Sequence, residues 1–235
     1  MYAVGKFLDL TKAYDLIKHK RLLDKLDAYG FRGMVNKRFQ SNLANRTQFV
    51  EISHIDKNGR TQCKFQSSLR TITHGVTQDS VLGPLLFLLY INDLPLNIQA
   101  PKLILYADDT NVLITDRSPD TLQTKLSLVV KQLEIWFLYN DLLINSSKTV
   151  DMSFHFCHSI PTYKPHILLQ NNGIEYKSVV KFLGLIITGN LNWRAHICYV
   201  CNNLSKYVFV IKSVKKSFQQ PGVLEHLFRI ISFAT

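Results

Sequence analysis

The chain has 235 residues, of which 46% are hydrophobic and 11% aromatic, a composition that buries a sizeable core and excludes an intrinsically disordered protein. Its net charge of +11 at pH 7 favours a polyanionic partner, nucleic acid first and an anionic membrane surface second. Four cysteines are too few for a secreted disulfide scaffold, and the longest apolar run, residues 81–91, is too short to span a membrane. We therefore expect an intracellular protein, nuclear or cytoplasmic, with no membrane segment.

The N-terminal third begins with a short apolar run that ends at Asp9. Leu22, Leu23, Leu26 and Tyr29 then recur at helical spacing before Gly30, and Val35, Phe39 and Leu43 predict a second helix. Residues 47–52 and 63–73 read as strands around the hairpin signal Asn58-Gly59. Basic side chains on these segments either contact nucleic-acid phosphates or cover solvated faces.

Residues 74–84 are expected to form a loop, and Pro84 suits the first position of the helix that follows, towards Asp93. Two apolar runs, 103–105 and 112–114, flank Tyr106-Ala107-Asp108-Asp109. This pattern predicts a β-hairpin with both carboxylates at its tip. Adjacent carboxylates raise each other's pKa, so the tip is either a cation site or an ordinary turn, in which aspartate is common.

The C-terminal half begins with a helix start at Ser118-Pro119-Asp120. An apolar stripe follows, and it predicts a core-facing helix; its members are Leu122, Leu126, Val129, Val130, Leu133 and Phe137. Residues 150–156 alternate as a half-buried strand, Asn172-Gly173 marks a hairpin that leads into 179–187, and a helix is expected from Ala195. Cys198 and Cys201 have a zinc-like spacing, but one CxxC without a second pair is a weak signal.

Four groups of residues, in this order, resemble the catalytic core of reverse transcriptases, and more narrowly the non-LTR retrotransposon enzymes of the jockey and CR1 kind. They are Phe7-Leu8-Asp9-Leu10-Thr11-Lys12-Ala13-Tyr14-Asp15, His74 to Leu86, Tyr106-Ala107-Asp108-Asp109, and Lys181-Phe182-Leu183-Gly184. Tyr90-Ile91-Asn92-Asp93-Leu94-Pro95 extends the match, which runs from about Phe7 to about His196.

The resemblance implies an α+β polymerase palm: an antiparallel catalytic sheet backed by helices, with partial fingers and the start of a thumb. Residues 1–190 would form the palm with a fingers remnant, and 191–235 the start of a helical thumb or connection. Relatives carry most of their fingers, and an endonuclease, ahead of the first motif. We therefore expect a chain truncated at both ends, with fingers or endonuclease supplied elsewhere.

The resemblance also implies a two-metal nucleotidyl transfer with two Mg²⁺ ions, or Mn²⁺ in their place. Asp9 and Asp108 match the main metal ligands, Asp109 the supporting acid, and the backbone of Leu10 a further oxygen. Lys148 matches a lysine that protonates or screens the leaving pyrophosphate. The catalytic set is therefore Asp9, Asp108, Asp109 and Lys148.

Substrate contacts follow from the same resemblance. Tyr14 occupies the position of a ring that blocks a ribose 2′-hydroxyl, and Ala13 and Gln78 would help to bind the nucleotide. The template and primer positions are Gly83, Pro84, Phe182, Leu183 and Gly184. The implied partners are an RNA template, a DNA primer and deoxynucleoside triphosphates.

Two departures from the family pattern oppose activity. Thr77 and Asp79 stand where relatives have proline and glycine, and Asp79 adds a negative charge beside a path meant for polyanions. The alternative is therefore a catalytically dead, palm-derived nucleic-acid-binding protein, or a relic. A viral RNA-dependent RNA polymerase shares the paired aspartates, but those enzymes usually have glycine at the position of Ala107 and lack an aromatic gate like Tyr14.

Overall fold

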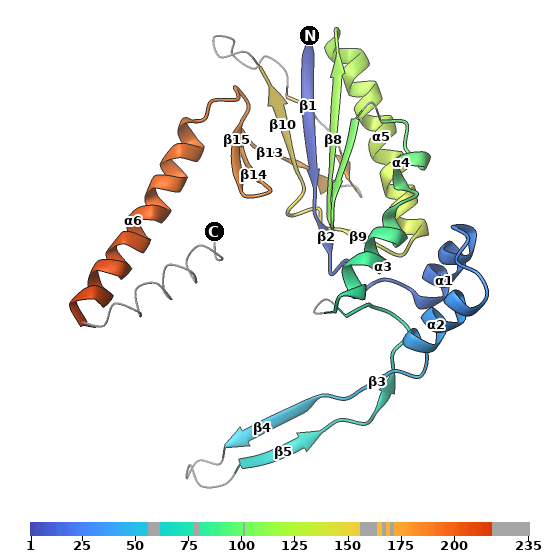
Figure 1. The fold of residues 1–235 in the computed structure, drawn as a ribbon. Helices are drawn as coiled ribbons and strands as arrows, with labels where there is room; N and C mark the ends of the chain where they lie inside the picture. Colours follow the sequence, from blue (N-terminus) through green and yellow to red (C-terminus); the bar gives the residue numbers. More distant parts are fainter. Residues whose placement is uncertain are drawn as a thin grey trace. The chain divides into compact units, whose positions relative to one another are not determined.

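The computed structural model describes residues 1–55, 62–77, 80–100, 102–155, 164–165, 168–169 and 172–217. These residues form an α+β fold, as expected, and the chain separates into two compact units (Figure 1). The first unit comprises Met1–Asp151 and Pro165–Glu175, and the second Met152–Lys164 and Tyr176–Thr235.

The largest sheet among the described residues has five strands, in the order β13-β10-β1-β8-β7. β1 (Tyr2–Leu8) and β7 (Lys102–Tyr106) both pair antiparallel with β8 (Asp109–Asp116). The boundary between the units runs through the other two strands, β10 (Val150–Phe154) and β13 (Glu175–Tyr176). The predicted acidic hairpin is thus present, and its second strand lies inside the sheet between β1 and β7.

Helix α5 (Pro119–Tyr139) covers this sheet (Figure 1), with Ser118 at its N-cap position and Pro119 as its first residue. All six predicted stripe residues are buried, and so is Trp136. They meet buried strand residues such as Val4, Val112 and Ile114. The 3.6-residue period therefore predicted both the helix and the face that it buries.

Three further helices complete the core of the first unit: α1 (His19–Ala28), α3 (Leu82–Ile91) and α4 (Leu94–Asn97). Lys25 of α1 ties them to α5, because its ammonium donates to the Tyr90 carbonyl at 2.7 Å and to Asp93 Oδ1 at 2.6 Å. The same ammonium lies 4.8 Å from the Trp136 ring centre. Helix α3 begins at Leu82, so Pro84 is its third residue and not its first; proline is tolerated there because first-turn amides have no helical acceptor.

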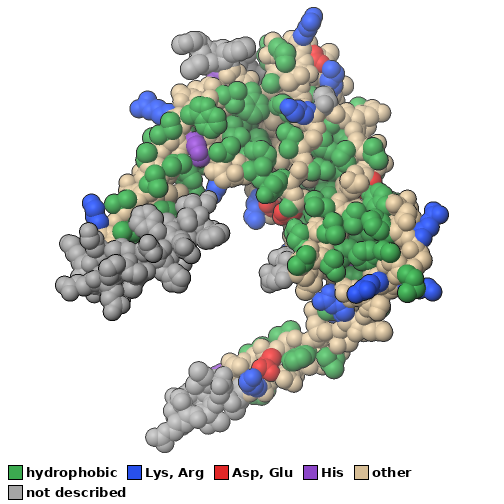
Figure 2. All heavy atoms as spheres, viewed as in Figure 1, with side chains coloured by type: hydrophobic (Ala, Val, Ile, Leu, Met, Phe, Trp, Pro, Cys, Tyr) green, Lys and Arg blue, Asp and Glu red, His purple; other side chains and the backbone are tan. Residues whose placement is uncertain are grey.

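Helix α2 (Met34–Leu43) packs on α1, and only Leu43 of the predicted stripe is fully buried. A hairpin follows, built from β3 (Thr47–Gln48), β4 (Glu51–Ile55), β5 (Gln62–Gln66) and β6 (Arg70–Thr71). β4 pairs with β5 and β3 with β6, as predicted, whereas Asn58-Gly59 lies outside the described residues. Hydrophobic side chains remain on its surface (Figure 2), among them Ile52 and Phe65.

The first unit also contains two short pairs of strands. β2 (Leu10–Thr11) pairs with β9 (Leu143–Ile144), and β11 (Leu168–Leu169) with β12 (Asn172–Gly173). Asn172-Gly173 therefore forms a strand opposite Leu168–Leu169.

The strand predicted at 150–156 is present in its described part as β10, but the prediction that it is half-buried was wrong. Asp151 and Ser153 are as buried as Val150 and Met152. The Lys6 ammonium of β1 donates to Asp151 Oδ1 at 2.6 Å, and both side chains are at most 2% exposed. Pairing therefore allows a charged residue at a position that the alternation had assigned to solvent.

The second unit contains a hairpin of β14 (Val179–Phe182) and β15 (Leu185–Thr188), and helix α6 (Arg194–Ser217). The expected helix from about Ala195 is present, and it packs on β15, where the Ile186 amide donates to His196 Nδ1 at 3.3 Å. In the described part of the chain, no helix has both the length and the hydrophobicity that a membrane span requires.

Candidate functional site

The tip of the β7–β8 hairpin presents two aspartates. Tyr106 pairs with Asp109, so Ala107 and Asp108 form a two-residue turn. Ala107 has φ of 50°, in the left-handed region, which matches the turn geometry that hairpins of this length prefer. As a result, Asp108 lies at the turn itself, and Asp109 is the first residue of β8.

Asp9 reaches the same place from β1. Leu8, the residue before Asp9, pairs with Thr110, the residue after Asp109, and the charge of Asp9 acts on the Asp109 carboxyl. The Asp9 backbone is held by the turn before β10: its carbonyl accepts from the Asn145 amide at 2.8 Å, and its amide donates to Thr149 Oγ1 at 3.5 Å. The first and third motifs therefore converge.

The charges of the three acids are coupled. Burial raises the pKa of Asp109, and the charges of Asp108 and Asp9 raise it further. Lys148 provides a countercharge, with its ammonium 3.7 Å from Asp9 Oδ2 and its side chain 69% exposed. A partly buried acidic cluster of this kind is relieved by a cation.

The carboxylates of this cluster suit a magnesium ion whose remaining ligands are waters and substrate phosphates. Among the described residues, no three His, Cys, Asp or Glu side chains form a complete metal site. Magnesium is usually bound through one or two carboxylates together with waters and substrate phosphates, and Asp9 and Asp108 can supply those carboxylates. Leu10, the predicted backbone ligand, is buried in β2 opposite Ile144.

Cys198 and Cys201 are free and exposed on α6, so the structure gives no support to a zinc site at these two cysteines.

Tyr14 lies beside the acids and is fixed on two sides. Its carbonyl accepts from the Val76 amide at 2.9 Å, and its ring lies 4.8 Å from that of Phe87 on α3. Burial raises the pKa of Tyr14, and the charge of Asp108 adds to the effect. The neighbouring Ala13 is buried. The structure therefore places the predicted sugar gate within electrostatic reach of the acidic turn.

The other predicted contacts divide into three groups. Gln78 and Asp79 lie outside the described residues. Gly83 is a packing position, because a Cβ there would lie 1.9 Å from the Thr77 carbonyl oxygen; Pro84 next to it is exposed. The predicted positions in the second unit form the β14–β15 turn, where Leu183 and Gly184 have φ of 46° and 82°. Phe182 is the last residue of β14.

Sequence reasoning missed three residues that support the site. Asn145 and Thr149 hold the Asp9 backbone, and Phe87 supports Tyr14. The polar run Asn145-Ser146-Ser147-Lys148-Thr149 between two apolar segments signalled a turn, though not its contact with Asp9. No sequence signal separates Phe87 from the other apolar residues of α3.

Replacing Asp109 with asparagine should stabilise the protein at pH 7. A folded-state pKa above the usual aspartate value means that the folded chain binds more protons than the unfolded chain, so folding stability falls as pH rises through that interval. We expect Asp109→Asn to raise the Tm at pH 7 by about 1–2 °C, a small gain because solvent screens a partly exposed group. The gain should disappear at about pH 2.5, well below the unperturbed aspartate pKa of about 3.9, where the carboxyl is protonated in both states.

Differential scanning calorimetry at both pH values measures this effect. Asp24→Asn, at an exposed position on α1, is the matched control and should leave the Tm unchanged at both. A Tm of Asp109→Asn below that of the wild type at pH 7 would show that the Asp109 carboxylate contributes a favourable interaction instead.

Comparisons with known proteins show which family this chain is similar to. The sequence profile of the family described as "Reverse transcriptase (RNA-dependent DNA polymerase)" matches residues 1–187. The chain is 28% identical over 203 residues to the RNA-directed DNA polymerase from mobile element jockey of Drosophila melanogaster, covering 83% of this chain and 21% of that protein. It is 24% identical over 224 residues to the Pol polyprotein from type-1 retrotransposable element R1 of Bradysia coprophila, covering 92% and 20%.

A solved structure of apo telomerase from Candida tropicalis, truncated from its C-terminal domain, covers 81% of this chain and 35% of that one, with 16% identity and a TM-score of 0.49. The chain thus spans about a fifth of the length of the curated relatives that it matches.

Proposed function

Since the chain belongs to the reverse transcriptase (RNA-dependent DNA polymerase) family, we propose that its site adds deoxynucleotides to a DNA primer on an RNA template, as part of a non-LTR retrotransposon enzyme. The observation that supports this most is the coupling of Asp109 to Asp108 and Asp9, which come from two separate motifs. Such a cluster is what a phosphoryl transfer needs, because its catalysis consists of positioning and charge neutralisation.

Divalent metal ions held at this cluster would activate the primer hydroxyl and stabilise the charge of the leaving pyrophosphate. In this proposal Asp9 and Asp108 are the main ligands, with Asp109 and the Leu10 carbonyl as supporting oxygens. Lys148 holds a proton close to Asp9, where its ammonium screens or protonates the pyrophosphate. Tyr14 orients the sugar, with Ala13 and Gln78 beside the nucleotide.

The fold suggests how the rest of the chain divides. We propose that residues 1–190 form a palm with part of the fingers, and that 191–235 begin a thumb or connection. The antiparallel strands β7, β8 and β1 then form the catalytic sheet, and α1, α2 and the β3–β6 hairpin belong to the fingers. Gly83, Pro84 and the β14–β15 turn would position the template and primer.

Primer extension tests this function. Because the chain spans about a fifth of its relatives, two proteins are measured: the chain itself, and a hybrid in which the N-terminal segment of the jockey polymerase precedes Met1. Extension by the hybrid that depends on Mg²⁺ or Mn²⁺ supports the proposal. A hybrid that binds primer–template but does not extend it would favour a catalytically dead nucleic-acid-binding protein.

Replacing Tyr14 with valine should weaken discrimination against ribonucleotides. The Tyr14 ring is held against Phe87, and removing it opens space where a 2′-hydroxyl would lie. The ratio of kcat/KM for deoxynucleotides to that for ribonucleotides should fall by at least about tenfold. The measurement is single-nucleotide incorporation by the hybrid with each substrate.

Tyr139→Val is the control, because Tyr139 is an exposed residue at the end of α5 and should leave the ratio unchanged. If Tyr14→Val discriminates as the wild type does, Tyr14 is a packing residue and sugar selection lies elsewhere.

A further inference from the structure

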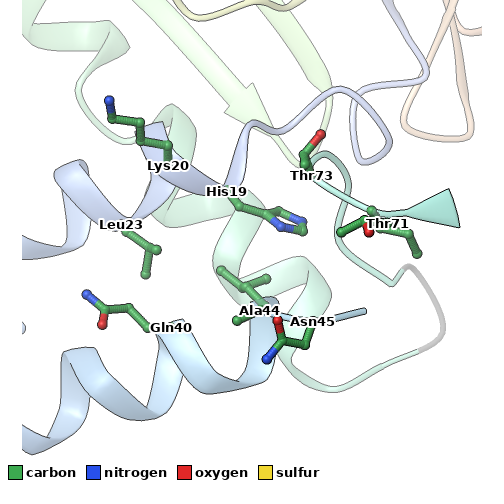
Figure 3. A pocket seen from close by; sticks show the side chains of 10 residues that line it. His19, Lys20, Leu23, Gln40, Ala44, Asn45, Thr71 and Thr73 are labelled. Atoms are coloured by element: carbon green, nitrogen blue, oxygen red, sulfur yellow. The ribbon is translucent and has the colours of Figure 1, made fainter. Parts of the chain in front are cut away.

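A cavity of about 410 Å³ lies in the first unit, apart from the acidic cluster. Its walls come from α1, from the C-terminal end of α2, and from β6 with the residues that follow it. In Figure 3, His19 and Leu23 of α1 face Gln40, Ala44 and Asn45 across the opening. The volume falls in the range of pockets that bind small organic groups.

Backbone hydrogen bonds fix these walls. The His19 amide donates to the Thr73 carbonyl at 3.2 Å, and the Ile72 amide donates to the Arg46 carbonyl at 2.8 Å. His19 is also held by its side chain, with Nε2 2.8 Å from the Gly75 carbonyl oxygen. The elements that form the pocket are therefore already hydrogen-bonded to one another. A ligand does not have to order them, which lowers the free-energy cost of binding.

The lining is apolar on its sides and polar at its rim. Leu23, Leu43 and the His19 ring supply apolar and aromatic surface, and Gln40 and Asn45 supply amides that make no hydrogen bond within the described part of the chain. None of the described lining residues is acidic. A flat heterocycle with hydrogen-bonding groups on its edge matches this combination.

One basic residue lines the pocket, and two more are next to lining residues in the sequence. Lys20 belongs to the lining, Arg46 follows Asn45, and Arg70 precedes Thr71. In a chain with a net charge of +11, these positions favour a ligand whose ring is attached to phosphates. Nucleobases of a single strand are recognised in this way, with the base unstacked and bound by its faces and its edge.

The cavity is also joined to the candidate active site. Gly75, which binds the His19 ring, donates its own amide to the Ile17 carbonyl at 2.8 Å. The next residue, Val76, holds the Tyr14 carbonyl at 2.9 Å. A group in the pocket therefore contacts the same loop that positions the predicted sugar gate.

We propose that this pocket binds an unpaired base of single-stranded nucleic acid, which is the template strand if the proposed function holds. Phosphate contacts alone would bind base-free and base-bearing strands equally, whereas a base pocket distinguishes them. The proposal therefore concerns binding, and it can be tested without any catalysis.

The experiment compares the affinity of the full chain for two single strands of about 12 nucleotides, a length within the usual site sizes. One carries uracil throughout and the other is abasic. Fluorescence anisotropy at fixed salt should show about tenfold tighter binding of the base-bearing strand, which is what one stacked base contributes. Ala44→Phe, which fills the pocket from its rim, should reduce this ratio to about one.

Asn42→Phe adds the same ring to the opposite side of α2 and should leave the ratio unchanged. Gln40→Leu removes the amide without adding bulk, so it tests the pocket independently if Ala44→Phe has a lowered Tm. In a 4-thiouridine strand, photocrosslinks should map to His19, Leu43 or Thr73.

Equal affinity for the two wild-type strands, or an undiminished ratio in both pocket variants, would overturn the proposal. Primer extension by the hybrid is measured separately. If the hybrid extends primers and the two strands bind equally, the pocket proposal fails alone. If the pocket variants behave as expected and the hybrid does not extend, only the proposed function fails.

Discussion

Asp108→Asn is expected to slow nucleotide addition by the hybrid about a thousandfold, because losing a metal contact removes several kcal/mol of transition-state stabilisation. Asp108 occupies the turn of the hairpin, and its charge acts on both Asp109 and Tyr14. Primer–template affinity should stay the same or rise slightly, because the substitution removes a negative charge near the nucleic acid. Single-turnover extension and an equilibrium binding measurement separate the two effects.

Asp24→Asn again serves as the matched control and should extend primers at the wild-type rate. A calorimetric Tm for each variant excludes unfolding as the cause of lost activity. Wild-type extension rates in Asp108→Asn would contradict the assignment of this turn as the catalytic centre. Absence of extension by both the chain and the unmodified hybrid would contradict the proposed function itself.

The largest expected effect on stability comes from the buried pair in the sheet. Lys6→Met should lower the free energy of unfolding by about 3–5 kcal/mol, because it leaves the Asp151 carboxylate buried without its partner. Burial raises the pKa of Asp151 and lowers that of Lys6, so each charge is tolerated mainly because of the other. Urea unfolding monitored by circular dichroism measures the loss.

Two further variants test the cause. Lys102→Met, at an exposed position on β7 of the same sheet, should have little effect. The double variant Lys6→Met with Asp151→Leu should recover most of the stability, because a well-packed apolar pair often replaces a buried ion pair without loss. If the double variant is no more stable than Lys6→Met, lost packing and not an unpaired charge explains the effect.

The parts of the fold that sequence predicted have a strong local signal. The α5 stripe repeats over about four turns, and the start of the helix is marked by Ser118-Pro119-Asp120. The acidic hairpin has two apolar strands joined by two residues, so its register admits few alternatives. The convergence of Asp9 with the hairpin was expected for a different reason, the resemblance of both motifs to one enzyme family.

The parts that it missed depend on contacts between distant segments. Lys6 and Asp151 are 145 positions apart, and nothing local shows that either charge has a partner. Gly83 is a different case, because no sequence signal showed that packing requires a glycine there. Its place in a family motif suggested a template contact, but the structure shows that the Thr77 carbonyl leaves no room for a side chain. Close packing of the loop on α3 is therefore one reason for a glycine at this position, and the template contact stays a prediction.

The β4–β5 hairpin has a consequence for how the protein behaves in solution. Within the described part of the chain, its two strands pair only with each other, and Ile52 and Phe65, which lie opposite each other, are each 63% exposed. A hairpin with open edges and apolar side chains is a template for strand addition from another copy, and so for aggregation. The net charge of +11 keeps copies apart at low ionic strength, and salt screens this repulsion. The high salt that strips contaminating polyanions during purification therefore also promotes self-association through this hairpin.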